Sequence, residues 1–517
     1  MRTKIHSKIY AVLLCLLAMC MTTSVYFTNL MWVLLLANWV VEWKWRDRFA
    51  DFRHRYMLQA FLVATGVHLL WLVGTADLAY GLYDLQKKLP LLAIPLVVLT
   101  TPAPTRKERI NILICYVGTV FVVSIIGIVR YLTLPDLPYR DIIPYISHIR
   151  FSLNICLAMV LLTYTALKMR KWWFYLISGG VLLWFTLFLS VLHSYTAFII
   201  LYVTAVTLLI AYRHRMGVRL RRALLAVVGI VTLAVGGMTG KYLYDYYHLQ
   251  PLSAETPPAG TANGNPYLHR KDGLIENGNY VHWYVCEKEM RQEWVKRSDY
   301  PFDSLTPNGY TIYPALLRYL NGLGTTKDSL GMTLLQPRDI AAIEKGIANP
   351  VYLQRGPRKL FYVMFYEYEN YRCYNSVNNF SVLQRLELWK NGWQVFLQHP
   401  LLGVGTGDVV AECHQRLDET QSPLAGTDMH THNQYLNFLI AFGLIGFLLI
   451  AAAFVRALLR NRLCRSVLFS AFLCIALISF VSEDTLETLA GIVFVGLGTS
   501  LLARIATPNP SNPTSDC

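Results

Sequence analysis

Charged side chains are scarce in this chain. Asp, Glu, Lys and Arg make up 15% of its 517 residues, whereas 54% of the residues are hydrophobic. A soluble domain carries about 25% charged residues, so this composition excludes an ordinary soluble protein and predicts a polytopic membrane protein. The net charge of +15 does not indicate a nucleic-acid partner, because membrane proteins gather Lys and Arg in their cytoplasmic loops.

Regularly spaced cysteines are also missing. The ten cysteines include no CxxC motif, and most of them lie within apolar runs. This pattern predicts neither a zinc site nor a disulfide scaffold. Three cysteines lie in the one long polar stretch of the chain: Cys286, Cys373 and Cys413. One disulfide among them is compatible with the sequence but is not required by it.

Long apolar runs, in contrast, are abundant. Twelve of them approach the roughly 20 residues that a membrane-spanning helix needs, at 9–27, 29–42, 57–77, 88–101, 110–131, 151–168, 172–190, 195–212, 222–241, 435–455, 466–481 and 486–504. They predict an all-α polytopic membrane protein of about 12 transmembrane helices, nine within 1–241 and three within 435–504. The Pro- and Ser-rich residues 505–517 are expected to form a disordered cytoplasmic tail.

The distribution of basic residues predicts the orientation of these spans. With the N-terminus in the cytoplasm, clusters such as "KWRDRFADFRHR" and "RHRMGVRLRR" fall on the cytoplasmic side. The short outer loops and their edges then hold only Lys87, Lys88, Arg130, Arg140 and Arg150. This asymmetry follows the positive-inside rule and places both termini in the cytoplasm.

One polar stretch, residues 242–434, interrupts the spans and lies outside in this topology. It is long enough to form a small domain between spans nine and ten. The spacing of its apolar and aromatic residues predicts helices over 278–298 and 381–400, the second ending at Pro400. We therefore expect a large, mainly helical outer loop domain.

Two histidines and an asparagine stand directly before the tenth span, in "HTHNQY": His430, His432 and Asn433. Histidine titrates near neutral pH and suits general-base catalysis. A histidine at a helix boundary can equally be a structural residue bound to a backbone carbonyl. The HxH spacing resembles a pair of metal ligands, but no third ligand is evident, so no metal is predicted.

Cationic groups that suit a diphosphate lie on the same outer side. Arg150 precedes span six, Arg385 lies on the predicted helix that reaches His399, and His193 lies between spans seven and eight. An arginine fork binds phosphate oxygens well. The structural alternatives are a snorkelling side chain for Arg150 and a solvated helix face for Arg385.

Three further patterns have structural interpretations. "GVGTGD" at 403–408 looks like a phosphate-binding turn, but no strand precedes it, so we interpret it as a tight turn. Ser482 is expected to cap the last helix, with Glu483, Asp484 and Glu487 favouring its N-terminus; a catalytic carboxylate is the alternative. Gly443 and Gly446 predict a close-packing helix face.

Two of these motifs together resemble the O-antigen ligase and polymerase superfamily. They are "WKNGWQVFLQHPLLGVGTGD" (389–408) and "HTHNQYLNFLIAFGLIG" (430–446). The resemblance is strongest to ligase-like proteins of Bacteroides-type bacteria. It extends over most of the chain through the segments 85–97, 148–153, 316–332 and 483–491.

The resemblance implies a membrane glycosyltransferase with a GT-C-like fold. Such a ligase moves a glycan from undecaprenyl diphosphate to lipid A-core on the periplasmic face of the bacterial inner membrane, in lipopolysaccharide biosynthesis, with inversion and without a metal or other cofactor. It implies His432 or His430 as the catalytic base, Arg385, Arg150 and His193 as donor diphosphate ligands, and Asn433, Tyr435 and His399 as supporting residues. Many relatives carry an arginine between spans seven and eight, where this chain reads "LHSYTAF", so Arg150 or His193 is expected to replace it.

Other functions stay open. A polymerase of surface polysaccharide shares the fold and the motifs of a ligase. A transporter or flippase suits the number of spans, but it would place ionisable residues near the middle of the bilayer, where these spans hold few charges. A purely structural membrane protein leaves the outer histidines and arginines unexplained.

Overall fold

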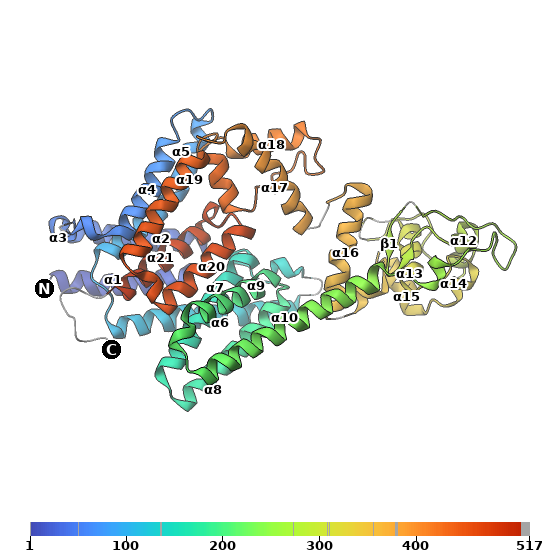
Figure 1. Ribbon diagram of the computed structural model, residues 1–517, viewed down its shortest axis with the longest axis horizontal. Helices are drawn as coiled ribbons and strands as arrows, with labels where there is room; N and C mark the ends of the chain where they lie inside the picture. The colour runs from blue at the N-terminus through green and yellow to red at the C-terminus, as the bar shows by residue number, and fades with distance from the viewer. Residues whose placement is uncertain are drawn as a thin grey trace. The chain divides into compact units, whose positions relative to one another are not determined.

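The computed structural model describes residues 2–507 except 50, 135–136, 272, 308, 310, 355 and 378–380, and it is mostly helical (Figure 1). The chain divides into two compact units, Met1–Arg222 with Arg385–Cys517, and Ala223–Gln384. Residues 385–434, which the sequence places in the outer loop domain, thus belong to the first unit. Most of the expected disordered tail, 508–517, lies outside the described residues.

Long helices build the first unit. They are α1 (Arg2–Cys20), α2 (Val25–Glu42), α4 (Tyr56–Leu70), α5 (Leu78–Thr100), α6 (Arg106–Thr133), α7 (His148–Met169), α8 (Trp172–Val191), α9 (Tyr195–Tyr212), α17 (Ser381–Gln398), α19 (Gln434–Arg460), α20 (Val467–Ser482) and α21 (Leu489–Ala506). Shorter helical segments join them: α3 (Trp45–Phe49), η1 (Phe52–His54), η2 (Tyr139–Asp141), η3 (Arg213–Arg215), α18 (Val409–Glu419), η5 (Leu463–Arg465) and η6 (Thr485–Glu487).

Eight helices in the described part of the chain are long and apolar enough to cross a membrane: α2, α6, α7, α8, α9, α10 (Val218–Tyr247), α19 and α21. Helices α4 and α20 are apolar but shorter. Helices α1 and α5 contain charged residues, such as Asp84 and Lys88 of α5. Each of the twelve predicted ranges overlaps a helix, although 9–27 runs from α1 across a turn into α2. The prediction of a polytopic helical membrane protein is confirmed.

Aromatic side chains fill the interior of the helical bundle. Phe151 of α7, Phe188 of α8, Phe472 of α20 and Phe494 of α21 are almost fully buried. Helix α5 packs along α21, and α4 packs along α19. Because lipid tails are as apolar as leucine, such close packing, rather than escape from water, holds membrane helices together.

Helix α19 is broken at Gly443, whose φ of 59° and ψ of −167° are not helical. The break frees two carbonyls, and the loop after α17 satisfies them: Val404 N–H donates to Ile440 O (2.9 Å) and Gly405 N–H to Ala441 O (3.0 Å). In return, Leu444 N–H donates to Pro400 O (2.9 Å). A Cβ on Gly443 would meet the Leu401 carbonyl at 2.3 Å. Gly443 is thus a kink, whereas Gly446 packs closely against α4, as expected.

The loop continues as the tight turn expected at 403–408. Thr406 N–H donates to Trp71 O (3.1 Å). The Asp408 carboxylate accepts from the backbone N–H groups of Ala76 (2.7 Å) and Asp77 (2.9 Å), just before α5 begins. Both carboxylate oxygens of Asp408 hold backbone at this turn, which supports a structural interpretation over phosphate binding.

The second unit contains most of α10 and a set of short elements. They are α11 (Pro251–Ala254), β1 (Ile275–Glu276), β2 (Asn279–Tyr280), α12 (Glu287–Val295), α13 (Ile312–Gly322), α14 (Ser329–Thr333), α15 (Pro337–Glu344), η4 (Pro350–Leu353) and α16 (Pro357–Tyr374). The strands β1 and β2 form an antiparallel pair. Trp294, Tyr319 and Leu316 are fully buried in its core.

The two helices predicted in the polar stretch have different outcomes. Helix α17 ends at Gln398, two residues before Pro400, and is confirmed. The helix predicted over 278–298 is wrong in its first half, because only Glu287–Val295 is helical. An Asn277-Gly278 turn, with positive φ at both residues, pairs β2 with β1 instead.

Candidate active site

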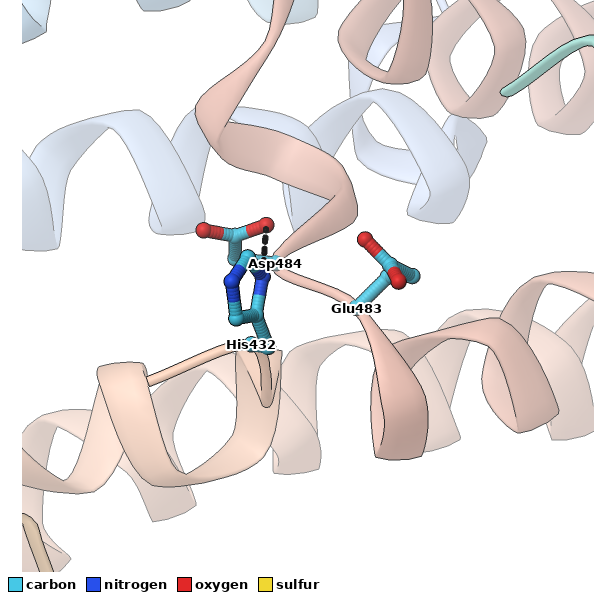
Figure 2. A group of neighbouring side chains, drawn as sticks. All are labelled: His432, Glu483 and Asp484. Atoms are coloured by element: carbon cyan, nitrogen blue, oxygen red, sulfur yellow. Dashed lines mark ion pairs between the residues drawn. The ribbon is translucent and has the colours of Figure 1, made fainter. Parts of the chain in front are cut away.

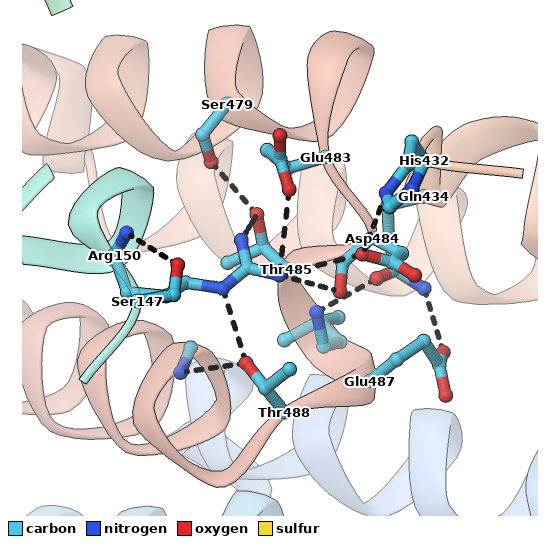
Figure 3. Close-up of polar contacts among 12 residues, drawn as sticks. Ser147, Arg150, His432, Gln434, Ser479, Glu483, Asp484, Thr485, Glu487 and Thr488 are labelled. Carbon is cyan, nitrogen blue, oxygen red and sulfur yellow. Dashed lines mark hydrogen bonds and ion pairs between the residues drawn. The ribbon is translucent and has the colours of Figure 1, made fainter. Parts of the chain in front are cut away.

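The turn between α20 and α21 is the centre of the site. It carries two buried carboxylates, Glu483 and Asp484, each 5% exposed. Buried carboxylates need charged or hydrogen-bonding partners. Here the partners come from α7 and from the residues before α19 (Figures 2 and 3), and a further partner comes from α17.

Arg150, on the first turn of α7, binds this turn with all three guanidinium nitrogens. Its Nε donates to Thr488 Oγ1 (3.1 Å) and one terminal nitrogen donates to Thr485 Oγ1 (3.3 Å). The other donates to the Asp484 carbonyl (3.2 Å) and carboxylate (3.4 Å) and lies 3.8 Å from Glu483. Arg150 is 6% exposed, so it is a buried clamp rather than a snorkelling side chain.

Arg385 approaches the same turn from α17. Its Nη2 donates to Glu483 Oε1 at 2.6 Å. Its Nε is buried and has no hydrogen-bond partner among the described residues. Arg385 is therefore paired through one terminal nitrogen and keeps Nε–H as a further donor, which does not fit a merely solvated helix face.

His432 faces Asp484, with its Nδ1 3.8 Å from Asp484 Oδ1 (Figure 2). The residue has a positive φ of 47°, a conformation that is uncommon outside glycine. The next residue, Asn433, caps α19 by accepting the Leu436 N–H (3.1 Å). The imidazole remains 35% exposed, so it lies where a buried carboxylate meets an accessible surface.

The five side chains form a row in which basic and acidic groups alternate: Arg385, Glu483, Arg150, Asp484 and His432, whose imidazole carries charge only when protonated. One ligand atom each of His432, Glu483 and Asp484 lie within 4.8 Å of one another, a grouping that could hold a metal ion. However, two guanidinium groups already neutralise the two carboxylates, so a divalent cation would unbalance the cluster. The arrangement favours a site that works through protonation and cationic side chains.

A second polar network lies beside this row and was not predicted. Lys88 of α5 binds Asp84 (2.6 Å) and Glu487 (3.0 Å). Gln434, fully buried at the start of α19, donates to Glu487 (3.1 Å) and accepts the Leu486 N–H (2.7 Å) (Figure 3). A charged residue inside an apolar run requires a partner, and Lys88 gave that signal in the sequence.

A cavity of about 150 Å³ opens next to this network, and its lining includes Lys88, Asp484, Thr488 and His430. His430 is exposed. Asp484 therefore lies near both histidines of the HxH motif: it lines the cavity with His430, and its Oδ1 is 3.8 Å from His432 Nδ1.

Other predicted residues have structural contacts. The Tyr435 hydroxyl donates to Leu477 O (2.9 Å), which joins α19 to α20. The His193 ring packs against Tyr139 (5.4 Å between centroids), which in turn contacts His148 (5.5 Å). His399 is exposed at the end of α17. Among the described residues, the His399 side chain has no interaction with the Asp484 cluster.

The expectation for the last helix needs a correction. Thr488, not Ser482, caps α21, since its hydroxyl accepts the Gly491 N–H (3.4 Å). The Ser482 hydroxyl is buried and unpartnered within the described residues. Glu483 and Asp484 thus bind arginines from other helices. The sequence did not indicate these ion pairs, because acidic residues after a serine are ordinary at a helix N-terminus.

These features define a polytopic helical membrane protein with a buried histidine–carboxylate–arginine cluster at one end of its helices. Residues 346–451 match the model of the O-antigen ligase family. That family consists of enzymes of glycan transfer, so the match confirms the expectation of an enzyme and supports the resemblance over these residues. The matched region includes Arg385, His430 and His432, whereas Arg150 and Asp484 lie outside it. No curated protein matches the chain.

Proposed function

We propose that this protein is an O-antigen ligase-type glycosyltransferase, which moves a glycan from undecaprenyl diphosphate to lipid A-core. The observation that supports this function best is the contact between His432, within the family-matched region, and the buried Asp484 outside it. The ligase-like proteins of Bacteroides-type bacteria remain the relatives that its sequence segments resemble.

In the proposed reaction, His432 is the general base. Its Nδ1 faces Asp484, which leaves Nε2 to accept the proton of the acceptor hydroxyl. The acceptor oxygen then attacks the anomeric carbon of the donor sugar from the face opposite the diphosphate. A new glycosidic bond forms, the bond to the diphosphate oxygen breaks with its electron pair, and the configuration inverts.

The leaving diphosphate gains negative charge, which preorganised cations stabilise. Arg385 is the proposed donor ligand because its buried Nε has no partner among the described residues. The guanidinium nitrogens of Arg150 already donate hydrogen bonds to the 484–488 turn. We therefore propose that Arg150 positions Asp484. The N-termini of α7, α19 and α21 also meet here and favour an anion. The proposed reaction needs no metal.

The proposed topology has twelve spans, with both termini in the cytoplasm of a bacterium. The 242–434 segment and the Asp484 cluster then lie on the periplasmic face of the inner membrane, where no nucleotide pool exists and a lipid-linked donor supplies the energy. The basic clusters of the predicted cytoplasmic loops support this orientation.

The test is a lipopolysaccharide gel of the native host with its own gene deleted and complemented. We expect wild type to restore the ladder and His432→Ala to lose it, because a general base contributes about 10²–10⁴-fold to the rate. His430→Ala measures the role of the second histidine. His399→Ala is the matched control, because it changes an exposed histidine of the same region. A full ladder from His432→Ala at normal expression would reject the assigned base.

A polysaccharide polymerase is the alternative within this family, and the same deletion separates the two. Loss of a ligase leaves carrier-linked chains and bare core, whereas loss of a polymerase leaves single repeats on core.

A transporter is less favoured by the structure, although α19 is a broken helix of the kind that transporters use. The carbonyls freed at the break are already bound by the 404–405 backbone and offer no ion site. Flux of labelled lipid-linked glycan in liposomes would contradict the enzyme proposal if it occurred without transfer.

A further inference from the structure

The second unit contains a cavity of its own, of about 310 Å³. Residues from the end of α10, the β1–β2 turn, the end of α13 and α16 line it. This volume falls at the lower end of the roughly 300–1,000 Å³ typical of ligand sites. Its lining combines aromatic rings, side-chain amides and one group of each charge.

Tyr246 supplies the first sign of an absent ligand. It is 2% exposed and lines the cavity, yet its hydroxyl has no hydrogen-bond partner among the described residues. Its ring packs against Phe365 (5.6 Å between centroids) and Tyr362 (5.9 Å), which also line the cavity. A buried tyrosine hydroxyl usually finds a partner, so this one is set up to bind something in the cavity.

Asn277 supplies the second sign. Its Nδ2 is buried without a partner in the described part of the chain, although the side chain lines the cavity. The turn that carries it is fixed from both sides: Gly278 N–H donates to Tyr246 O (2.7 Å), and Gln250 N–H donates to Gly278 O (2.9 Å). The backbone that carries Asn277 is therefore held in place beside the cavity.

The rigid floor of the cavity comes from a buried ion pair. Glu276 Oε1 accepts from Arg318 Nη2 (2.6 Å) and from the Tyr362 hydroxyl (2.9 Å), which fixes the Tyr362 ring. At the rim, Asp245 and Arg358 are exposed and carry opposite charges. The rim is thus neutral overall, which does not suit a diphosphate but suits an uncharged ligand with many hydroxyl groups.

We infer that this cavity binds a sugar unit of a glycan. Flat aromatic faces pack against the C–H face of a pyranose ring, while amide, hydroxyl, carboxylate and guanidinium groups bind its hydroxyls. The pocket lies at the end of a helix that is long and apolar enough to span the membrane, so it would take a sugar close to the membrane surface. This inference adds a sugar site to the proposed function. It rests on that function only for the origin of the sugar, which would belong to the transferred glycan.

The test uses the full-length protein in nanodiscs. The probe is the free oligosaccharide released by mild acid from the surface polysaccharide of the native host, with binding measured by calorimetry. Tyr246→Phe removes the hydroxyl donor, and Asn277→Asp replaces the two amide donors by a carboxylate. Both keep the shape of the side chain, and Asp tolerates the positive φ of residue 277. Tyr244→Phe, on the exposed side of the same helix, is the matched control.

We expect saturable binding that weakens about tenfold in Tyr246→Phe and in Asn277→Asp and stays unchanged in Tyr244→Phe. Unchanged affinity in both cavity variants, or no saturable binding by wild type, overturns the inference. His432→Ala should bind the oligosaccharide normally. Transfer by His432→Ala together with cavity-dependent binding would reject the proposed base but not the sugar site, so the two failures are distinguishable.

Discussion

At the scale of single residues, Asp484 is the point where positioning and chemistry meet. Its Oδ1 accepts a hydrogen bond from Arg150 and also faces His432 Nδ1. Because Arg150 also binds Thr485, Thr488 and the Asp484 main chain, the carboxylate has little freedom to move. The contact between α7 and the turn before α21 therefore fixes the carboxylate that the imidazole faces.

Asp484→Asn tests this positioning. The substitution keeps the size of the side chain and removes the charge that faces His432. We expect kcat to fall about 10²-fold, the loss that a misplaced catalytic group produces, with a smaller effect on KM. Steady-state kinetics with a purified lipid-linked donor measure both values. Asp418→Asn, at an exposed position of α18, is the control, and equal rates for wild type and Asp484→Asn would contradict the role.

Arg385→Lys tests the proposed diphosphate ligand. Lysine keeps the positive charge that pairs with Glu483 but lacks the Nε–H donor. We expect KM for the donor to rise about tenfold, the equivalent of one lost charge-assisted hydrogen bond. If lysine restores full donor use and only Arg385→Ala is impaired, the ion pair with Glu483 is what matters, and the diphosphate assignment fails.

The candidate site was partly predictable from the sequence. His432 and Arg385 lie in motifs whose residue types suit a base and an anion ligand. Their partners were not predictable, because Arg150 contacts residues more than 330 positions away. Glu483 and Asp484 stand where an acidic helix start is ordinary, so local sequence favoured a cap over an ion pair.

At the scale of elements, the break in α19 fixes the site to the bundle. The loop 400–405 binds the main chain exposed at Gly443, and α17, which carries Arg385, leads directly into that loop. His432 stands at the start of the same broken helix. The distance between the proposed base and the proposed diphosphate ligand is therefore set by main-chain hydrogen bonds as well as by side chains.

Gly443→Ala tests the break. A Cβ there would meet the Leu401 carbonyl at 2.3 Å, and the positive φ disfavours alanine. We expect the free energy of unfolding to fall by at least about 1–3 kcal/mol, seen as a lower Tm in detergent, together with reduced transfer. Gly179→Ala in α8, where nothing lies within 4 Å and the backbone is helical, should keep the wild-type Tm. An unchanged Tm in Gly443→Ala would contradict the constraint.

Helices were predictable wherever a long apolar run existed. They were less predictable where charged residues interrupted the run or where the only signal was the spacing of aromatic residues. The fifth helix begins at Leu78, ten residues before the predicted span at 88. Its charged residues are paired, because Lys88 binds Asp84 and Glu487, and Lys87 lies 3.5 Å from Asp84. The spacing of Tyr280 and Tyr284 suggested a helix, but the Asn277-Gly278 turn placed Tyr280 in a strand. Ion pairs and strand pairs of this kind depend on residues that lie outside the segment being predicted.

At the scale of the whole molecule, the two units divide the work that the proposed function requires. The first unit carries the Asp484 cluster, and the second carries the sugar cavity. The expectation of twelve spans places the α12 segment and the α19–α20 turn on opposite sides of the membrane.

Cysteine labelling tests this orientation. Cys464 is exposed in the α19–α20 turn, and Lys296 is exposed at the end of α12. In variants with one cysteine each, we expect Lys296→Cys to react with an impermeant maleimide in intact spheroplasts. Cys464 should react only after permeabilisation, because its basic turn is predicted to be cytoplasmic. Labelling of both, or the reverse order, would contradict the predicted topology.

The shortness of α20 has a consequence for the membrane around it. Its 16 residues rise only about 24 Å, less than the roughly 30 Å of a hydrocarbon core. If α20 spans the bilayer, the lipid leaflets must thin beside it, and the turn that holds Asp484 lies at its end. The lipid headgroups would then lie closer to the Asp484 cluster. The acyl-chain length of the host lipids would set how far the bilayer must deform when a lipid-linked donor reaches this cluster.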